Sequence, residues 1–226
     1  FGRQVVERMN TLGIAVDLDF EGLVVPVVPD ADTLTLFSFP VNDGAITIAN
    51  GATLSTNNQD LINAGIVGGG GTLRLTNVGT ATGRALINQG TIRAGTSPGT
   101  LDITGDLVLT ASSVTEIELG GLTAGSQFDH ITVSGRATLA GTLDVKTVGG
   151  YVPLPGTTYD FLQFTTRTGV YGNVENSTPF AGLMFDVTYA TNRATINVSG
   201  VPGDANLDGI VSGADYTVWS DHFGTG

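Results

Sequence analysis

The chain has 226 residues, of which 33 are glycine and none is cysteine, and its 9 Lys and Arg against 21 Asp and Glu leave a formal net charge of −12. This charge disfavours nucleic acid and anionic membranes as partners, and the lack of cysteine excludes disulfides and thiolate metal sites. No stretch approaches the roughly 20 apolar residues that a membrane-spanning helix needs, so membrane insertion is not expected.

Residues 1–44 match no known pattern, and we expect them to form an amino-terminal cap or an exchangeable strand region. Apolar side chains recur on one side of residues 4–12, which predicts a short helix that stops at Gly13. The apolar runs Ile14–Phe20 and Leu23–Val28 follow. They are the best candidates for strand pairing with another copy of the chain.

Residues 45–200 are predicted to form the body of the protein, and they read as β structure almost throughout. Thr, Val, Ile and Leu alternate with polar residues in short runs that Gly or Asn separates, as half-buried strands require. The predicted strands, including one that precedes residue 45, are Thr33–Phe37, Ala45–Ile48, Leu101–Ile103, Leu107–Leu109, Val114–Leu119, Ile131–Val133 and Ala194–Val198.

An internal repeat indicates how these strands are arranged. The sequence Leu-Ile-Asn-Ala-Gly-Ile at residues 61–66 recurs 25 residues later as Leu-Ile-Asn-Gln-Gly-Thr-Ile, and Gly-Thr-Leu follows at Gly71, Gly99 and Gly141. A repeat of this length built from short strands predicts an all-β fold, a parallel β-helix or solenoid. Asn63 would then stack over Asn88 as an amide ladder, with Leu73, Leu101 and Leu143 facing one interior. The alternative is a β-sandwich in which the Gly-Thr-Leu turns recur by coincidence.

The segments 90–106, 135–143 and 151–164 give this body a family resemblance. With their Gly-rich turns and Gly-Thr-Leu strands they resemble the end of an autotransporter passenger β-helix, over roughly residues 45–198. The resemblance implies a secreted surface structure, such as an adhesin, a fibre or a matrix component, which occasionally carries an enzyme. The chain departs from the family after residue 200, where another module stands in place of a membrane barrel.

Residues 201–226 contain a candidate calcium loop. Oxygen donors fall at positions 1, 3, 5, 7, 9 and 12 of a twelve-residue frame, and Gly209 at position 6 allows the sharp turn that such a loop needs. The predicted ligands are the side chains of Asp204, Asn206, Asp208, Ser212 and Asp215 and the main-chain carbonyl of Ile210. The alternative is a solvated acidic turn, because Asp, Asn and Gly are common in turns.

Residues 214–223 are predicted to be helical, with Tyr216, Trp219 and Phe223 on one face. The loop and the signature from Asp215 to Trp219 resemble half of a type I dockerin over residues 203–224, which implies the same six calcium ligands. A complete dockerin has two such units. The positions that recognise a cohesin in the cellulosome type hold Gly213-Ala214 and Ser220-Asp221 here, so calcium binding carries over better than cohesin docking. We expect the aromatic face to pack against a neighbouring domain or a second repeat.

The residues offer little for catalysis. Asp129 and His130 lie on opposite faces of a predicted strand and cannot act together. Glu116 and Glu118 share one strand face and could pair as glycosidase carboxylates do, but an outward polar face also explains them. No nucleophile, metalloprotease or nucleotide-binding motif is present. The chain is therefore predicted not to be an enzyme.

The sequence thus predicts an extracellular or cell-surface protein of bacterial type, non-enzymatic, with a structural or adhesive role and calcium as its cofactor. One form of this hypothesis is a filament-forming subunit, a homopolymer joined by strand pairing. A cohesin-like or cell-surface partner of residues 201–226 is a further hypothesis. The alternative function is a carbohydrate-active or carbohydrate-binding β-helix protein that attaches through the dockerin-like module.

Overall fold

The computed structural model describes residues 34–35, 41–76, 83–95, 98–175 and 182–223. These ranges contain β-strands almost throughout, together with one helix, α1 (Gly213–Phe223). The predicted helix at residues 4–12 and the runs Ile14–Phe20 and Leu23–Val28 lie outside the described residues. Of the predicted strand Thr33–Phe37, the structure describes two residues, which form β1.

Three sheets run along the molecule, and each is built from strands far apart in sequence. Sheet A has the order β1 (Leu34–Thr35), β4 (Thr53–Ser55), β7 (Thr72–Arg74), β10 (Thr100–Thr104), β13 (His130–Val133), β16 (Thr158–Gln163), β20 (Arg193–Gly200), β19 (Leu183–Tyr189). Sheet B contains β2 (Val41–Asn42), β5 (Leu61–Asn63), β8 (Ala85–Asn88), β11 (Asp106–Leu109), β14 (Arg136–Leu139) and β17 (Thr166–Gly169). Sheet C contains β3 (Ala45–Ile48), β6 (Ile66–Gly69), β9 (Thr91–Ala94), β12 (Val114–Leu119), β15 (Thr142–Thr147) and β18 (Asn173–Glu175).

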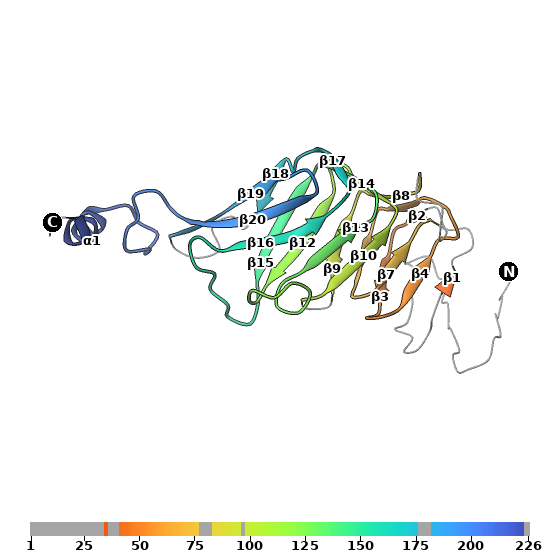
Figure 1. Cartoon of the computed structure of the whole chain (residues 1–226), viewed down its shortest axis with the longest axis horizontal. Coiled ribbons are helices and arrows are strands. Elements are labelled where there is room, and N and C mark those ends of the chain that lie inside the picture. The colour runs from red at the N-terminus through yellow and green to blue at the C-terminus, as the bar shows by residue number, and fades with distance from the viewer. Residues whose placement is uncertain (1–33, 36–40, 77–82, 96–97, 176–181, 224–226) are drawn as a thin grey trace.

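Each coil of the chain adds one strand to every sheet, so that β4, β5 and β6 are followed in the next coil by β7, β8 and β9. Neighbouring strands from β1 to β18 pair in parallel within each sheet. This topology is a parallel β-solenoid, and its coils are stacked along the longest axis of the molecule (Figure 1). It confirms the predicted fold class and excludes the sandwich, which consists of two antiparallel sheets.

The core follows from the alternation of side chains along each strand. In β12, Thr115, Ile117 and Leu119 point inward, while Glu116 and Glu118 point outward. Leu73, Leu101 and Leu143 are each 0% exposed, which confirms that all three face the interior. Each such burial contributes about 1.5–3 kcal/mol, repeated in every coil.

The Gly-Thr-Leu repeats do not occupy equivalent positions in the coils. Leu73 in β7 is in register with Ile103 of β10 rather than with Leu101. Leu143 lies in β15, which belongs to sheet C. The motif therefore marks a glycine turn followed by a strand whose leucine points inward. It occurs on more than one side of the solenoid.

A ladder of asparagine amides fills the corner between sheets B and C. Asn63 Nδ2 donates to Asn88 Oδ1 at 2.6 Å, as the repeat predicts, and Asn42 Nδ2 donates to Asn63 Oδ1 at 2.6 Å. Glycine follows two residues after each of these asparagines because the coils approach closely there. A Cβ at Gly65 would run into the carbonyl oxygen of Gly44, and one at Gly90 into that of Gly65.

The carboxyl-terminal end of sheet A is closed by an antiparallel hairpin. β20 pairs with β16 and with β19, and Leu183 and Phe185 of β19 are buried against the core. We call β19 and β20 the capping hairpin. Beyond it the chain continues to α1, which lies apart from the stacked strands at one end of the molecule (Figure 1).

Candidate metal centre

The predicted calcium loop follows the capping hairpin and turns sharply at two residues. Leu207 and Gly209 both adopt left-handed backbone angles, with φ of 58° and 86°. These turns bring the carboxylate of Asp204, the first predicted ligand, to the backbone N–H groups in the middle of the loop. Asp204 Oδ1 accepts a hydrogen bond from Asp208 N at 3.1 Å, and Asp204 Oδ2 accepts one from Gly209 N at 2.8 Å.

Asp215 closes the loop from the first turn of α1. Its Oδ1 accepts from Asn206 N at 3.3 Å and its Oδ2 from Ser212 N at 2.6 Å, while Ser212 Oγ accepts from Ala214 N at 3.1 Å. This reciprocal pattern is a capping box, which satisfies the free N–H groups at the start of a helix. The backbone N–H of Ser212, followed by those of Asn206 and Ala205, holds the pKa of the Asp215 carboxyl below its ordinary value.

The remaining predicted ligands lie on the same short stretch of chain. Asn206 Nδ2 donates to Asp208 Oδ2 at 2.8 Å, and Asp208 Oδ1 accepts from Ile210 N at 2.8 Å. The Ile210 side chain is a hydrocarbon, so only its backbone carbonyl would serve a metal. Within twelve consecutive residues the loop therefore carries carboxylate, amide, hydroxyl and carbonyl oxygens, the donor types that calcium takes.

The charge of the loop also fits a cation. Asp204 and Asp215 are each 4% exposed, and none of the ion pairs among the described residues reaches them or Asp208. Both buried carboxylates accept backbone N–H groups instead, which leaves their negative charge available to a cation. In the part of the chain that the structure describes, no three Asp, Glu, His or Cys side chains gather as a ready metal cluster. A bound ion would therefore need the neutral oxygens of Asn206, Ile210 and Ser212 as well.

Two aromatic side chains of α1 are largely exposed. Tyr216 is 67% exposed and Trp219 is 54% exposed, and the two rings lie 5.9 Å apart. Among the residues that the structure describes, the expected packing of these two rings against a neighbouring domain is therefore not seen.

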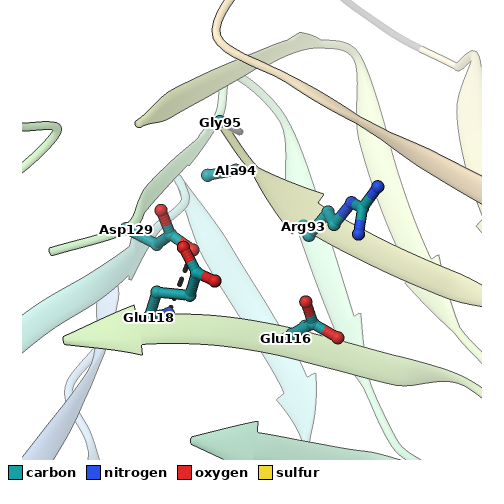
Figure 2. A pocket seen from close by; sticks show the side chains of 6 residues that line it. All are labelled: Arg93, Ala94, Gly95, Glu116, Glu118 and Asp129. Carbon is teal, nitrogen blue, oxygen red and sulfur yellow. Dashed lines mark hydrogen bonds between the residues drawn. The ribbon is translucent and has the colours of Figure 1, made fainter. Parts of the chain in front are cut away.

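An acidic hollow on the solenoid is the second concentration of polar side chains. It has a volume of about 110 Å³ and is lined by Arg93, Ala94, Gly95, Glu116, Glu118 and Asp129. Figure 2 shows Glu118 beside Asp129, with Arg93 and Glu116 farther along the strands. Glu116 is bound to Lys146 Nζ at 2.6 Å, so the two glutamates of β12 do not form an isolated pair.

Asp129 is the buried member of the hollow and is 1% exposed. Its carboxylate accepts from Gly99 N at 2.8 Å and from Glu118 N at 3.0 Å. Burial raises its pKa to about 7, although the two N–H donors oppose the shift and the charges of Glu118 and Glu116 add to it. Asp129 thus ties the segment before β13 to β12 and β10. His130 lies half-buried at the start of β13, whereas Asp129 precedes the strand, so strand alternation does not decide their faces.

Sequence reasoning missed Asn42, the first rung of the amide ladder. Its signal is present, because Asn42-Asp-Gly44 repeats the Asn-x-Gly pattern of Asn63 and Asn88. The spacing of 21 residues instead of 25 hid it.

No family model matches the chain. Over 144 residues, or 62% of its length, the chain is 30% identical to a protein described as adhesin BmaC autotransporter from Brucella suis biovar 1 (strain 1330). The chain spans about 4% of the length of that relative. This similarity supports the autotransporter-like character of the solenoid. Among the described residues, no helix has the length and apolar character needed to cross a membrane.

Proposed function

We propose that this chain is a secreted, non-enzymatic structural or adhesive protein of a bacterial cell surface or matrix. The observation that carries the proposal is the parallel β-solenoid together with its similarity to an autotransporter adhesin. A solenoid suits this role because stacked coils expose a long, repetitive surface whose outward residues do not hold the core. On the outward face of β12 and β15, Lys146 forms ion pairs with Glu116 and Asp144.

The alternative, a carbohydrate-active solenoid, would require a free carboxylate pair. The best candidates are engaged, since Lys146 holds Glu116 and two backbone N–H groups hold Asp129. The test is incubation of the purified protein with a panel of polysaccharides, with and without calcium, followed by measurement of reducing ends. We expect none to be released. Release that is lost in Glu118→Gln would overturn the proposal in favour of the alternative.

We also propose that residues 204–215 bind one calcium ion. The side chains of Asp204, Asn206, Asp208, Ser212 and Asp215 and the carbonyl of Ile210 would hold it. The ion would neutralise three carboxylates that the described residues leave without a cationic partner. Support comes from the left-handed turns at Leu207 and Gly209 and from the all-oxygen donor set.

Isothermal titration with calcium tests this site. We expect one ion per chain in the wild type and no binding in Asp204→Ala/Asp208→Ala, because the remaining carboxylate does not offset the dehydration of the ion. Asp221→Ala is the matched control, since this exposed carboxylate lies outside the loop. Calcium binding by the double variant at wild-type affinity would refute the assignment.

We further propose that copies of the chain join by strand pairing at the amino-terminal end of the solenoid. There β1, β2 and β3 are the terminal strands of their sheets within the described chain. The buried Oδ1 of Asn42 has no hydrogen-bond donor, although every other oxygen of the ladder has one. A strand added along β2 would supply that donor. A cohesin-like or cell-surface partner of the calcium module is the other attachment that we propose.

A further inference from the structure

The calcium loop is hydrogen-bonded to the end of the solenoid. Gly182, the residue before β19, accepts a hydrogen bond from Val201 N at 2.9 Å, and Val201 in turn accepts one from Asp204 N at 3.0 Å. The two bonds connect the start of the capping hairpin with its exit and with the first predicted calcium ligand. The loop thus begins on a surface that the hairpin fixes.

The loop also packs directly on Gly182. A Cβ at this position would lie 2.6 Å from Leu207 Cα and 2.7 Å from Asp204 Oδ2, closer than van der Waals contact allows. The side chain of Leu207 covers the hairpin exit, where its Cδ2 lies 3.4 Å from the Cβ position of Gly200. Leu207 is the residue between two predicted ligands, Asn206 and Asp208. The contact therefore acts on the ligand-bearing backbone itself.

We propose that Gly182 is a positioning residue of the calcium site, and that calcium binding and the order of the capping hairpin are linked through it. This inference rests on the calcium site proposed above. Gly182 gives Asp204 and Leu207 room to lie against the hairpin in the geometry that directs Asp204 into the loop. Because linkage is reciprocal, an ion that binds only the ordered loop also stabilises the hairpin surface on which the loop rests. Calcium thereby stabilises the capping hairpin.

The first test measures calcium affinity in Gly182→Ala by titration with calcium and, independently, by terbium luminescence. Gly51→Ala is the matched control, because Gly51 has the same φ of 76° but no atom within 4 Å of its Cβ position. Both variants place alanine at the same left-handed φ, but only Gly182→Ala introduces a Cβ against the loop. We expect about 10–100-fold weaker binding in Gly182→Ala, the loss typical of misplaced ligand support, and wild-type affinity in Gly51→Ala.

The second test needs no change at Gly182. Hydrogen exchange of the amides in Leu183–Tyr189 is followed with and without calcium, in the wild type and in Asp204→Ala/Asp208→Ala. At free calcium 100 times Kd we expect exchange through local opening to slow by up to about 100-fold in the wild type, and no calcium effect in the double variant.

The outcomes separate the two proposals. A wild type that binds no calcium or terbium refutes the calcium site itself. If the wild type binds calcium while Gly182→Ala has the affinity of Gly51→Ala, or while exchange in β19 is unchanged by the ion, the site stands and the link through Gly182 is wrong.

Discussion

The asparagine ladder offers the sharpest test of how this solenoid is held together, through the substitution Asn63→Leu. Asn63 is fully buried, and the two hydrogens of its amide nitrogen are shared among three acceptors. It accepts from Asn42 Nδ2 at 2.6 Å and donates to Asn88 Oδ1 at 2.6 Å, Thr91 O at 3.0 Å and Gly65 O at 3.2 Å. Leucine fits this corner, since Leu109 occupies the next rung in register with Asn88 and is 2% exposed.

The expected loss of unfolding free energy depends on which hydrogen-bond partners each neighbouring side chain keeps. In Asn63→Leu the buried Asn88 Oδ1 loses its donor, and an unsatisfied buried acceptor costs about 1–3 kcal/mol. With the other lost bonds, partly offset by the apolar side chain, we expect unfolding free energy to fall by about 2–4 kcal/mol. Asn88→Leu should cost only about 1 kcal/mol, because Asn63 Nδ2 keeps the carbonyls of Thr91 and Gly65 as acceptors.

The double variant Asn63→Leu/Asn88→Leu completes a thermodynamic cycle. It removes Asn88 Oδ1 together with its donor, Asn63 Nδ2, so that no unsatisfied buried acceptor remains. The double variant should therefore lose less unfolding free energy than the sum of the single variants, by about 1–3 kcal/mol. Urea unfolding followed by far-ultraviolet circular dichroism measures all four free energies. Costs that add to within about 0.5 kcal/mol, or a larger loss in Asn88→Leu than in Asn63→Leu, would refute the directional ladder.

Two further predictions concern pH and assembly. Because the pKa of Asp129 is raised from 3.8 to about 7, the folded protein keeps a proton that the unfolded chain releases. The resulting stability is complete below about pH 4 and is lost as pH rises through 7, with a slope of up to about 1.4 kcal/mol per pH unit. Urea unfolding between pH 4 and 8 should show this slope, and Asp129→Asn should flatten it; equal slopes in both proteins would contradict the assignment. Deletion of residues 1–28 should leave a folded, calcium-binding monomer in light scattering and micrographs, whereas unchanged oligomers, or an intact chain that stays monomeric with calcium, would contradict strand-mediated joining.

Local patterns carried most of the prediction of secondary structure. The limits of Ala45–Ile48 and Val114–Leu119 agree with β3 and β12, since alternation with a period of two is a property of consecutive residues. The predicted helix at 214–223 begins one residue late, because Ser212 and Asp215 cap it at Gly213. The loop frame from Asp204 to Asp215 is equally local, and whether it holds calcium stays a prediction.

By itself, the sequence predicted the solenoid, with a sandwich as the alternative, and determined one register, because the 25-residue repeat aligns Asn63 with Asn88 in adjacent strands. Only the tertiary structure placed Asn42 in the ladder, buried Asp129 under two N–H groups and set the calcium loop on Gly182. The Asn42–Asn63 bond joins residues 21 positions apart and the bond from Gly99 to Asp129 spans 30 positions, whereas the bond from Glu118 to Asp129 spans 11. A periodic pattern records which side of a strand faces inward, but the length of each intervening turn decides which residues meet, and that length follows no period.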